Sequence, residues 1–161
     1  MKSYKQKRKI IQSRGFTLIE LLGTIAIMAI TLAIGVPGIN SIIANSRLTA
    51  SANTMVSALQ RARSESIKQL KIAGIAPKNG SNWENGWVLW VGSNSSSNIV
   101  QTFEPSRNVD VTMSSDFIPS YRPDGRINGI AGSFTFSSDT DSRTVTIGNT
   151  GRVQVTNPQK S

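Results

Sequence analysis

The chain has 161 residues and a formal net charge of +9, and it contains neither cysteine nor histidine. The lack of these two residue types excludes disulfide bridges, a Ser-His-Asp triad and the usual zinc sites. Six basic residues precede Phe16 and no acid does, so the rest of the chain carries only +3. The charge therefore indicates a basic leader and says little about binding partners.

The first element is this leader, residues 1–15, which is followed directly by an apolar run over residues 16–36. As a helix this run would be about 31 Å long, enough to cross the hydrocarbon core of a bilayer. It contains one carboxylate, Glu20. A lone acid in a membrane costs on the order of 3 kcal/mol and therefore needs a partner. Cleavage after Gly15 would supply one, because the new α-amine of Phe16 would lie one helical turn before Glu20.

The junction Gly15-Phe16-Thr17-Leu18-Ile19-Glu20 resembles the processing site of type IV prepilins and of type II secretion pseudopilins. The resemblance implies that a prepilin peptidase cuts after Gly15 and that the new terminal Phe16 is N-methylated. It further implies that Glu20 guides assembly with other pilins or pseudopilins into a filament or tip complex. The chain would then be a single-pass protein of the bacterial inner membrane, with its C-terminal domain in the periplasm.

Two other interpretations of the apolar run compete with this one. The triplet Ala33-Ile34-Gly35 fits an ordinary secretory signal, but the run is longer than such a signal needs and contains Glu20. A plain membrane anchor would leave Glu20 and the Gly15-Phe16 junction without a role.

Residues 37–74 predict an amphipathic continuation of the helix. Pro37 predicts a kink or local melting near the end of the membrane-spanning part. Beyond it, residues spaced alternately by four and three form one predominantly apolar stripe: Leu48, Ala52, Met55, Leu59, Ala62, Ser66 and Leu70. Gly74 and Pro77 predict the end of the helix.

Residues 75–161 predict a β-rich domain. A loop is expected over residues 75–85, followed by strands near residues 86–91, 99–103, 109–113, 133–137, 143–147 and 152–156. The first of these strands is apolar on both faces, which is typical of a central strand. One long N-terminal helix packed on a small antiparallel sheet domain is an α+β fold.

The order of motifs in this domain resembles the GspH/FimT family of pseudopilins and minor pilins. They are Gly86-Trp87-Val88, Pro123-Asp124-Gly125-Arg126, Gly132-Ser133-Phe134-Thr135-Phe136, Arg143-Thr144-Val145-Thr146-Ile147 and Thr150-Gly151-Arg152-Val153. The resemblance implies two short β-sheets on the second half of the helix. It also implies a structural subunit that helps to start or cap a filament. We expect no enzymatic activity, cofactor or metal.

A DNA-binding minor pilin for natural transformation is the competing hypothesis. Some FimT members resemble DNA receptors with a Gly-Arg-x-Arg patch, and this chain has Arg152 in that place but Gln154 instead of the second arginine. Arg143 and Lys160 are the residues that could compensate. The sequence does not decide between a type II secretion pseudopilus and a type IV pilus, since the same membrane helix serves both.

Overall fold

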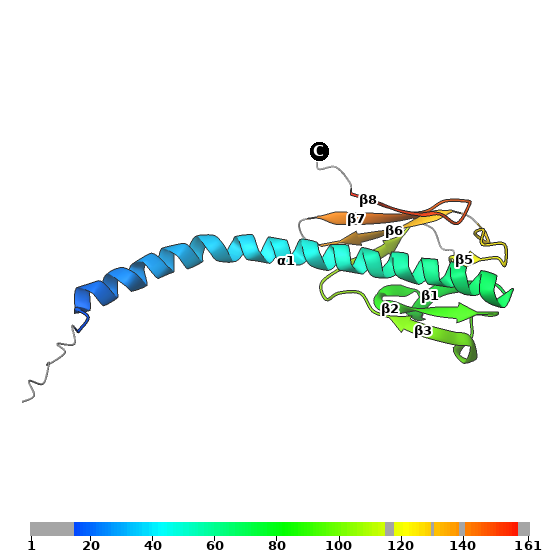
Figure 1. Cartoon of the computed structure of the whole chain (residues 1–161), viewed down its shortest axis with the longest axis horizontal. Coiled ribbons are helices and arrows are strands. Elements are labelled where there is room, and N and C mark those ends of the chain that lie inside the picture. Colours follow the sequence, from blue (N-terminus) through cyan, green and yellow to red (C-terminus); the bar gives the residue numbers. More distant parts are fainter. Residues whose placement is uncertain (1–14, 115–117, 130, 139–140, 158–161) are drawn as a thin grey trace, which may run out of the picture. The chain divides into compact units, whose positions relative to one another are not determined.

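The computed structural model describes residues 15–114, 118–129, 131–138 and 141–157, which form one long helix, one short 3-10 helix and eight strands (Figure 1). The chain divides into two units, Met1–Ile39 and Asn40–Ser161. The long helix α1, Leu18–Gln69, contributes to both units, whereas every described strand belongs to the second. The α+β class predicted from the sequence is confirmed.

The helical secondary structure of α1 continues through Pro37. The predicted local melting at this residue is therefore wrong. A proline removes one backbone donor and crowds one carbonyl, so the hydrogen-bonded turns before and after it can still hold the helix together.

The helix ends at Gln69, earlier than the predicted end at Gly74. Leu70 takes a left-handed conformation with φ of 54°, and the backbone N–H of Lys71 donates to the carbonyl oxygen of Ser66 at 3.3 Å. This is the hydrogen bond of a Schellman cap, in which the left-handed residue is usually glycine. Leu70 is 75% exposed, so it does not continue the buried stripe as predicted.

The first sheet has the strand order β3-β2-β1-β5, with antiparallel neighbours. Its strands are β1 (Ala73–Asn79), β2 (Asn82–Val91), β3 (Ile99–Phe103) and β5 (Ser120–Tyr121). The short 3-10 helix η1, Ser96–Asn98, lies in the connection from β2 to β3.

The second sheet has the order β4-β6-β7-β8 and is also antiparallel. Its strands are β4 (Asp110–Met113), β6 (Gly132–Ser137), β7 (Ser142–Ile147) and β8 (Val153–Thr156). The two short sheets implied by the family resemblance are therefore present, and the six predicted strands lie within two residues of the observed ones, apart from an earlier start of β2.

The predicted loop over residues 75–85 is wrong, because most of it forms β1 and the start of β2. The sequence predicts that Pro77 helps to end the helix, yet this residue lies within β1 opposite Trp87. The register of this strand pair shifts between Pro77 and Asn79, and an irregularity of this kind accommodates a residue without a backbone donor. Gly80, with φ of 58°, lies in the turn that leads into β2.

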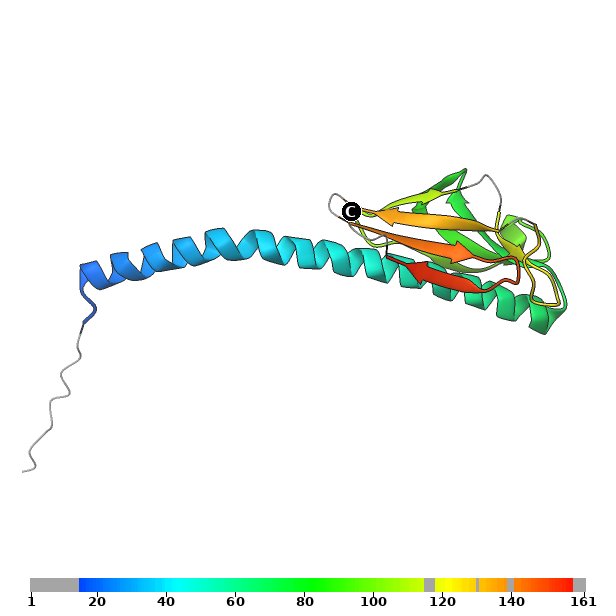
Figure 2. The same ribbon diagram turned by 90° about the horizontal axis from the view of Figure 1, so that it is seen from above.

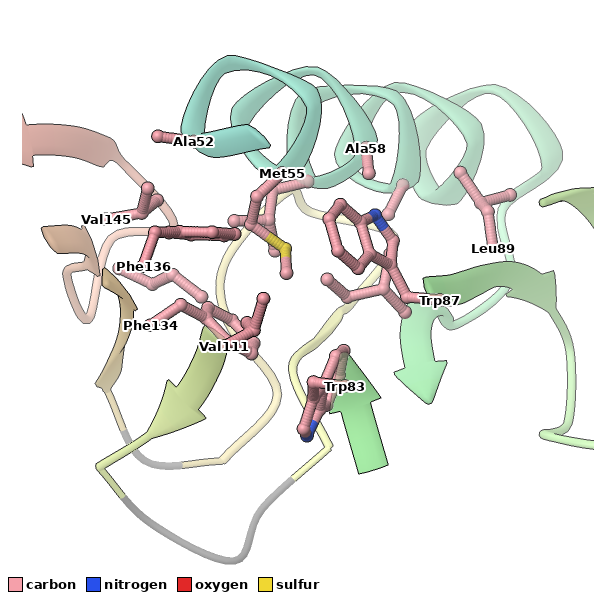
Figure 3. Packing of buried hydrophobic residues seen from close by; sticks show 14 of the residues in the cluster. Ala52, Met55, Ala58, Trp83, Trp87, Leu89, Val111, Phe134, Phe136 and Val145 are labelled. Carbon is pink, nitrogen blue, oxygen red and sulfur yellow. The ribbon is translucent and has the colours of Figure 1, made fainter. Parts of the chain in front are cut away.

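Both sheets pack against the same face of α1 within the second unit (Figures 1 and 2). The stripe positions Leu48, Ala52, Met55, Leu59, Ala62 and Ser66 are each at most 1% exposed. Figure 3 shows Met55 between Trp87 of β2 and Phe136 of β6. The two rings meet edge to face with their centroids 6.3 Å apart, so the helix and both sheets share one core.

Candidate processing and assembly site

The predicted cleavage junction lies immediately before the helix. Gly15 and Phe16 are both exposed, and Phe16 is 86% exposed. A Cβ atom built on Gly15 would meet no other atom within 4 Å. The described fold therefore does not require glycine at this position, so any requirement for glycine would have to come from another molecule that binds here.

Thr17 and Glu20 form a capping box at the start of α1. The backbone N–H and the hydroxyl of Thr17 donate to Oε2 of Glu20 at 2.9 and 3.0 Å, and the backbone N–H of Glu20 donates to the Thr17 hydroxyl at 3.3 Å. Such a pair satisfies donors that a helix N-terminus otherwise leaves free. The carboxylate of Glu20, which the sequence predicts to guide assembly, is therefore hydrogen-bonded to Thr17, the residue next to Phe16. Thr17 was not among the predicted site residues, although Thr-x-x-Glu before an apolar run is the sequence signature of a capping box.

The first half of α1 presents apolar side chains in every direction. Large apolar residues at ten positions from Leu18 to Ile34 are 54 to 76% exposed. The hydroxyls of Thr24 and Thr31 donate to the carbonyl oxygens of Leu21 and Ile27, so these polar groups are satisfied inside the helix. α1 is the only helix in the described part of the chain that is long and apolar enough to cross a membrane.

Of the predicted DNA contacts, Arg143 is engaged within the domain. Its guanidinium pairs with Asp141 at 3.1 Å, and it donates to the carbonyl of Ser142 and to Oδ1 of Asn45 on α1. The side chain is only 12% exposed. Its charge is therefore largely compensated before any DNA could approach.

The structure does not bring Arg143 and Arg152 together. Arg152 is exposed and precedes β8, whose Val153 pairs with Ile147 at the far end of β7 from Arg143. Five residues along a strand separate the two ends by about 17 Å. Lys160 lies outside the described residues. These contacts stay predictions, and the described geometry does not favour them.

Two motifs noted in the sequence meet at a pair of glycines. Gly125 and Gly151 have φ values of 76° and 79°, which favour glycine. A Cβ on Gly125 would lie 2.9 Å from Ile67 of α1, and one on Gly151 would lie 2.7 Å from the carbonyl oxygen of Gly125. Each residue thus needs to be glycine for two reasons, its backbone conformation and a close contact. The sequence showed the motifs, but their contact arises only in the fold.

Tyr121 lies beneath this contact and is fully buried. Burial raises the pKa of its phenol to about 12, and the nearby positive charge of Arg63 partly opposes the rise. Among the described residues the hydroxyl has no hydrogen-bond partner. The phenol therefore acts as a packing group that must stay neutral.

Comparisons with known proteins agree with this architecture. Residues 51–151 match the family described as type II transport protein GspH, and residues 11–36 match the prokaryotic N-terminal methylation motif. Among curated proteins, none matches this sequence.

Two solved structures show the same fold at low sequence identity. A crystal structure of the type IV minor pilin FimU of Pseudomonas aeruginosa PAO1 has a TM-score of 0.61 and 19% identity, covering 70% of this chain and 90% of FimU. The minor pseudopilin EpsH from the type 2 secretion system of Vibrio cholerae has a TM-score of 0.55 and 8% identity, covering 71% of this chain and 99% of EpsH. Because the GspH match spans more than half of the sequence, the chain belongs to the GspH family of pseudopilins and minor pilins.

Proposed function

We propose that this chain is a minor filament subunit, made as a precursor, cleaved between Gly15 and Phe16 by a prepilin peptidase and methylated at Phe16. The observation that carries the proposal is the position of the helix start: α1 begins at Leu18, two residues after the junction. Hydrolysis of that one peptide bond would remove the basic leader and leave an apolar helix with a charged amine at its end. The subunit would serve a type II secretion pseudopilus or a type IV pilus, where it helps to start or cap assembly.

Glu20 is the proposed assembly residue. Both bonds that it accepts from Thr17 use Oε2, and Oε1 accepts none among the described residues. The free oxygen can accept from the α-ammonium group of Phe16 in an adjacent subunit. In a low-dielectric surrounding this charge pair is much stronger than in water, which favours packing of the apolar helices side by side.

The proposed location follows from the leader and the apolar run. The basic leader holds the N-terminal end at the cytoplasmic face, and the helix spans the inner membrane. The sheet domain then lies in the periplasm. Side chains over residues 18–35 are exposed in the single chain, and lipid or neighbouring helices would cover them.

The first experiment identifies the N-terminus of the chain purified from cell membranes. Intact-mass spectrometry is expected to show a chain that begins at N-methylated Phe16. In Gly15→Val the leader of about 15 residues is expected to remain, because a peptidase that accepts only glycine there cannot cut. A wild-type chain that keeps its leader, or one that begins at Val36, would contradict the proposal.

The second experiment compares two substitutions in the apolar run. Glu20→Ala should leave cleavage intact but reduce incorporation into sheared filaments at least tenfold, measured by quantitative immunoblotting. Thr24→Ala is the matched control, since among the described residues the Thr24 hydroxyl bonds only to its own helix. Equal incorporation of both variants would remove the assembly role of Glu20.

A further inference from the structure

Four arginines are carried by three chain segments that meet at Gly125. Arg122 and Arg126 flank the turn that contains Gly125 and are joined by a backbone hydrogen bond of 2.9 Å. The Nε of Arg63 on α1 lies 3.2 Å from the place where a Gly125 Cβ would be, and Arg152 follows Gly151, which rests on the Gly125 carbonyl. We call Arg63, Arg122, Arg126 and Arg152 the arginine patch. The fold concentrates these charges although they are far apart in the sequence.

The described residues of the domain do not neutralise the patch. Arg122, Arg126 and Arg152 are exposed, Arg63 is partly exposed, and none of the four forms an ion pair among the described residues. Elsewhere in the same unit Lys78 pairs with Glu104 and Arg143 with Asp141. The turn itself contains one acid, Asp124, whose Oδ1 accepts the backbone N–H of Arg126. One carboxylate beside four guanidinium groups leaves a surplus of positive charge.

The patch is separated from two other exposed arginines, Arg47 and Arg107. Arg47 lies on α1 beside Leu48, and Arg107 follows Ser106, whose backbone N–H donates to Ser51 of α1. Arg63 follows Ser51 by twelve residues along the helix, a rise of about 18 Å. Arg47 and Arg107 therefore carry the same charge at a different place on the domain and provide a matched control.

We propose that the arginine patch docks a carboxylate-rich face of a neighbouring filament subunit, an inference that rests on the proposed assembly role. Guanidinium groups bind carboxylates through two parallel hydrogen bonds, and all four cations here are arginines rather than lysines. Family members associate with other pilins in a filament, so a neighbouring protein surface is present at a high effective concentration. Complementary charge at such a contact would set which subunit fits beside this one.

The geometry favours an acidic protein over DNA. The patch is compact, so it would contact about four phosphates at most, and so few contacts give only weak binding to duplex DNA at physiological salt. Asp124 lies within the patch and would repel a phosphate backbone, whereas a protein face can place a donor opposite it.

Binding to two anionic probes tests the proposal. The chain is purified from membranes in a neutral detergent, and fluorescence anisotropy measures its affinity for labelled poly-L-glutamate and for a DNA duplex of equal charge. Arg126→Gln/Arg152→Gln is compared with Arg47→Gln/Arg107→Gln. Both double variants lose two charges from exposed positions, so any difference between them reports location rather than net charge.

The unchanged chain is expected to bind poly-L-glutamate at low salt. Compared with it, Arg126→Gln/Arg152→Gln should bind about tenfold more weakly, and Arg47→Gln/Arg107→Gln less than twofold more weakly. Absent binding, an equal loss in both variants, or a patch effect below threefold would overturn the proposal. Tighter, patch-dependent binding of the DNA duplex would overturn it in favour of a nucleic-acid surface. The measurement does not depend on cleavage or filament assembly, so its failure can be distinguished from failure of the proposed function.

Discussion

The two halves of α1 have the same secondary structure but opposite relations to the rest of their own chain. Over residues 18–35 every side chain is exposed, and the large apolar ones point in all directions. Over residues 48–66 one stripe is fully buried against two sheets and the opposite face is polar. Helical propensity alone cannot separate these halves, because it is similar in both.

The comparison shows how one helix can belong to two environments. A helix that is apolar all round has no single face for a domain to cover, so lipid or other helices must surround it. A helix with a stripe buries that stripe within its own chain and keeps water on the other side. The second half should therefore stabilise the folded domain, while the first half should contribute to membrane insertion and assembly.

The largest expected effect is on the free energy of unfolding, when leucine is replaced by alanine in each half of α1. Leu59→Ala removes a fully buried side chain and should lower the free energy of unfolding by about 2–5 kcal/mol. Leu22→Ala, at a position 54% exposed, should change it by less than about 0.5 kcal/mol. Urea unfolding in detergent, followed by tryptophan fluorescence, measures both, since all three tryptophans lie in β2. Similar losses of unfolding free energy in both variants would contradict the difference between the two halves of α1.

A smaller loss of stability is expected when alkaline pH ionises Tyr121. Because burial raises the pKa of Tyr121 from 10.0 to about 12, the folded state holds the phenolic proton more tightly than the unfolded state. The resulting stability is fully present below pH 10 and is lost as pH rises through 12. Two pKa units correspond to roughly 3 kcal/mol.

Tyr121→Phe provides the control for this prediction. Phenylalanine keeps the packing and removes a hydroxyl that has no partner among the described residues, so stability at pH 7 should not fall. Between pH 9 and 12 the free energy of unfolding of Tyr121→Phe should then fall less than that of the unchanged chain. An identical pH dependence in both proteins would show that the phenol does not titrate in this way.

The smallest effect is expected at the glycine contact that packs on the last turns of α1. Gly151→Ala would place a Cβ 2.7 Å from the Gly125 carbonyl at a φ of 79°, and should cost about 1–3 kcal/mol. Gly148→Ala in the same hairpin turn has its nearest atom at 3.7 Å and no positive φ, so it should stay within about 0.5 kcal/mol. Thermal unfolding of the two variants side by side measures this difference. Equal melting temperatures would contradict the contact.

Most of the fold could be predicted from local patterns. The buried stripe from Leu48 to Ser66 follows from a period that only a helix satisfies, and the later strands follow from their alternation and turns. β1 could not be predicted in this way. Pro77 and Gly74 signal a break in local terms, but the pairing of Ala73 and Ile75 with Val91 and Leu89 outweighs that preference. Such pairing depends on residues distant in sequence.

For the candidate site, the sequence predicted Gly15, Phe16 and Glu20 because a basic segment, a small residue and a lone acid in an apolar run occur in that order within the first 20 residues. It grouped Arg152 with Arg143, whereas the fold puts these two at opposite ends of one hairpin. The segments that actually lie near Arg152 carry Arg122, Arg126 and Arg63, and no local pattern connects them.

The sequence by itself determined what depends on order along the chain: a basic N-terminal segment, a membrane-length apolar helix with one acid, an amphipathic continuation and a β-rich domain. Tertiary structure alone decided where α1 ends, that β1 forms, and which arginines gather around Gly125. The physical reason is that hydrophobic periodicity and caps act over a few residues, whereas strand pairing and close backbone contacts join segments that only a folded core brings together.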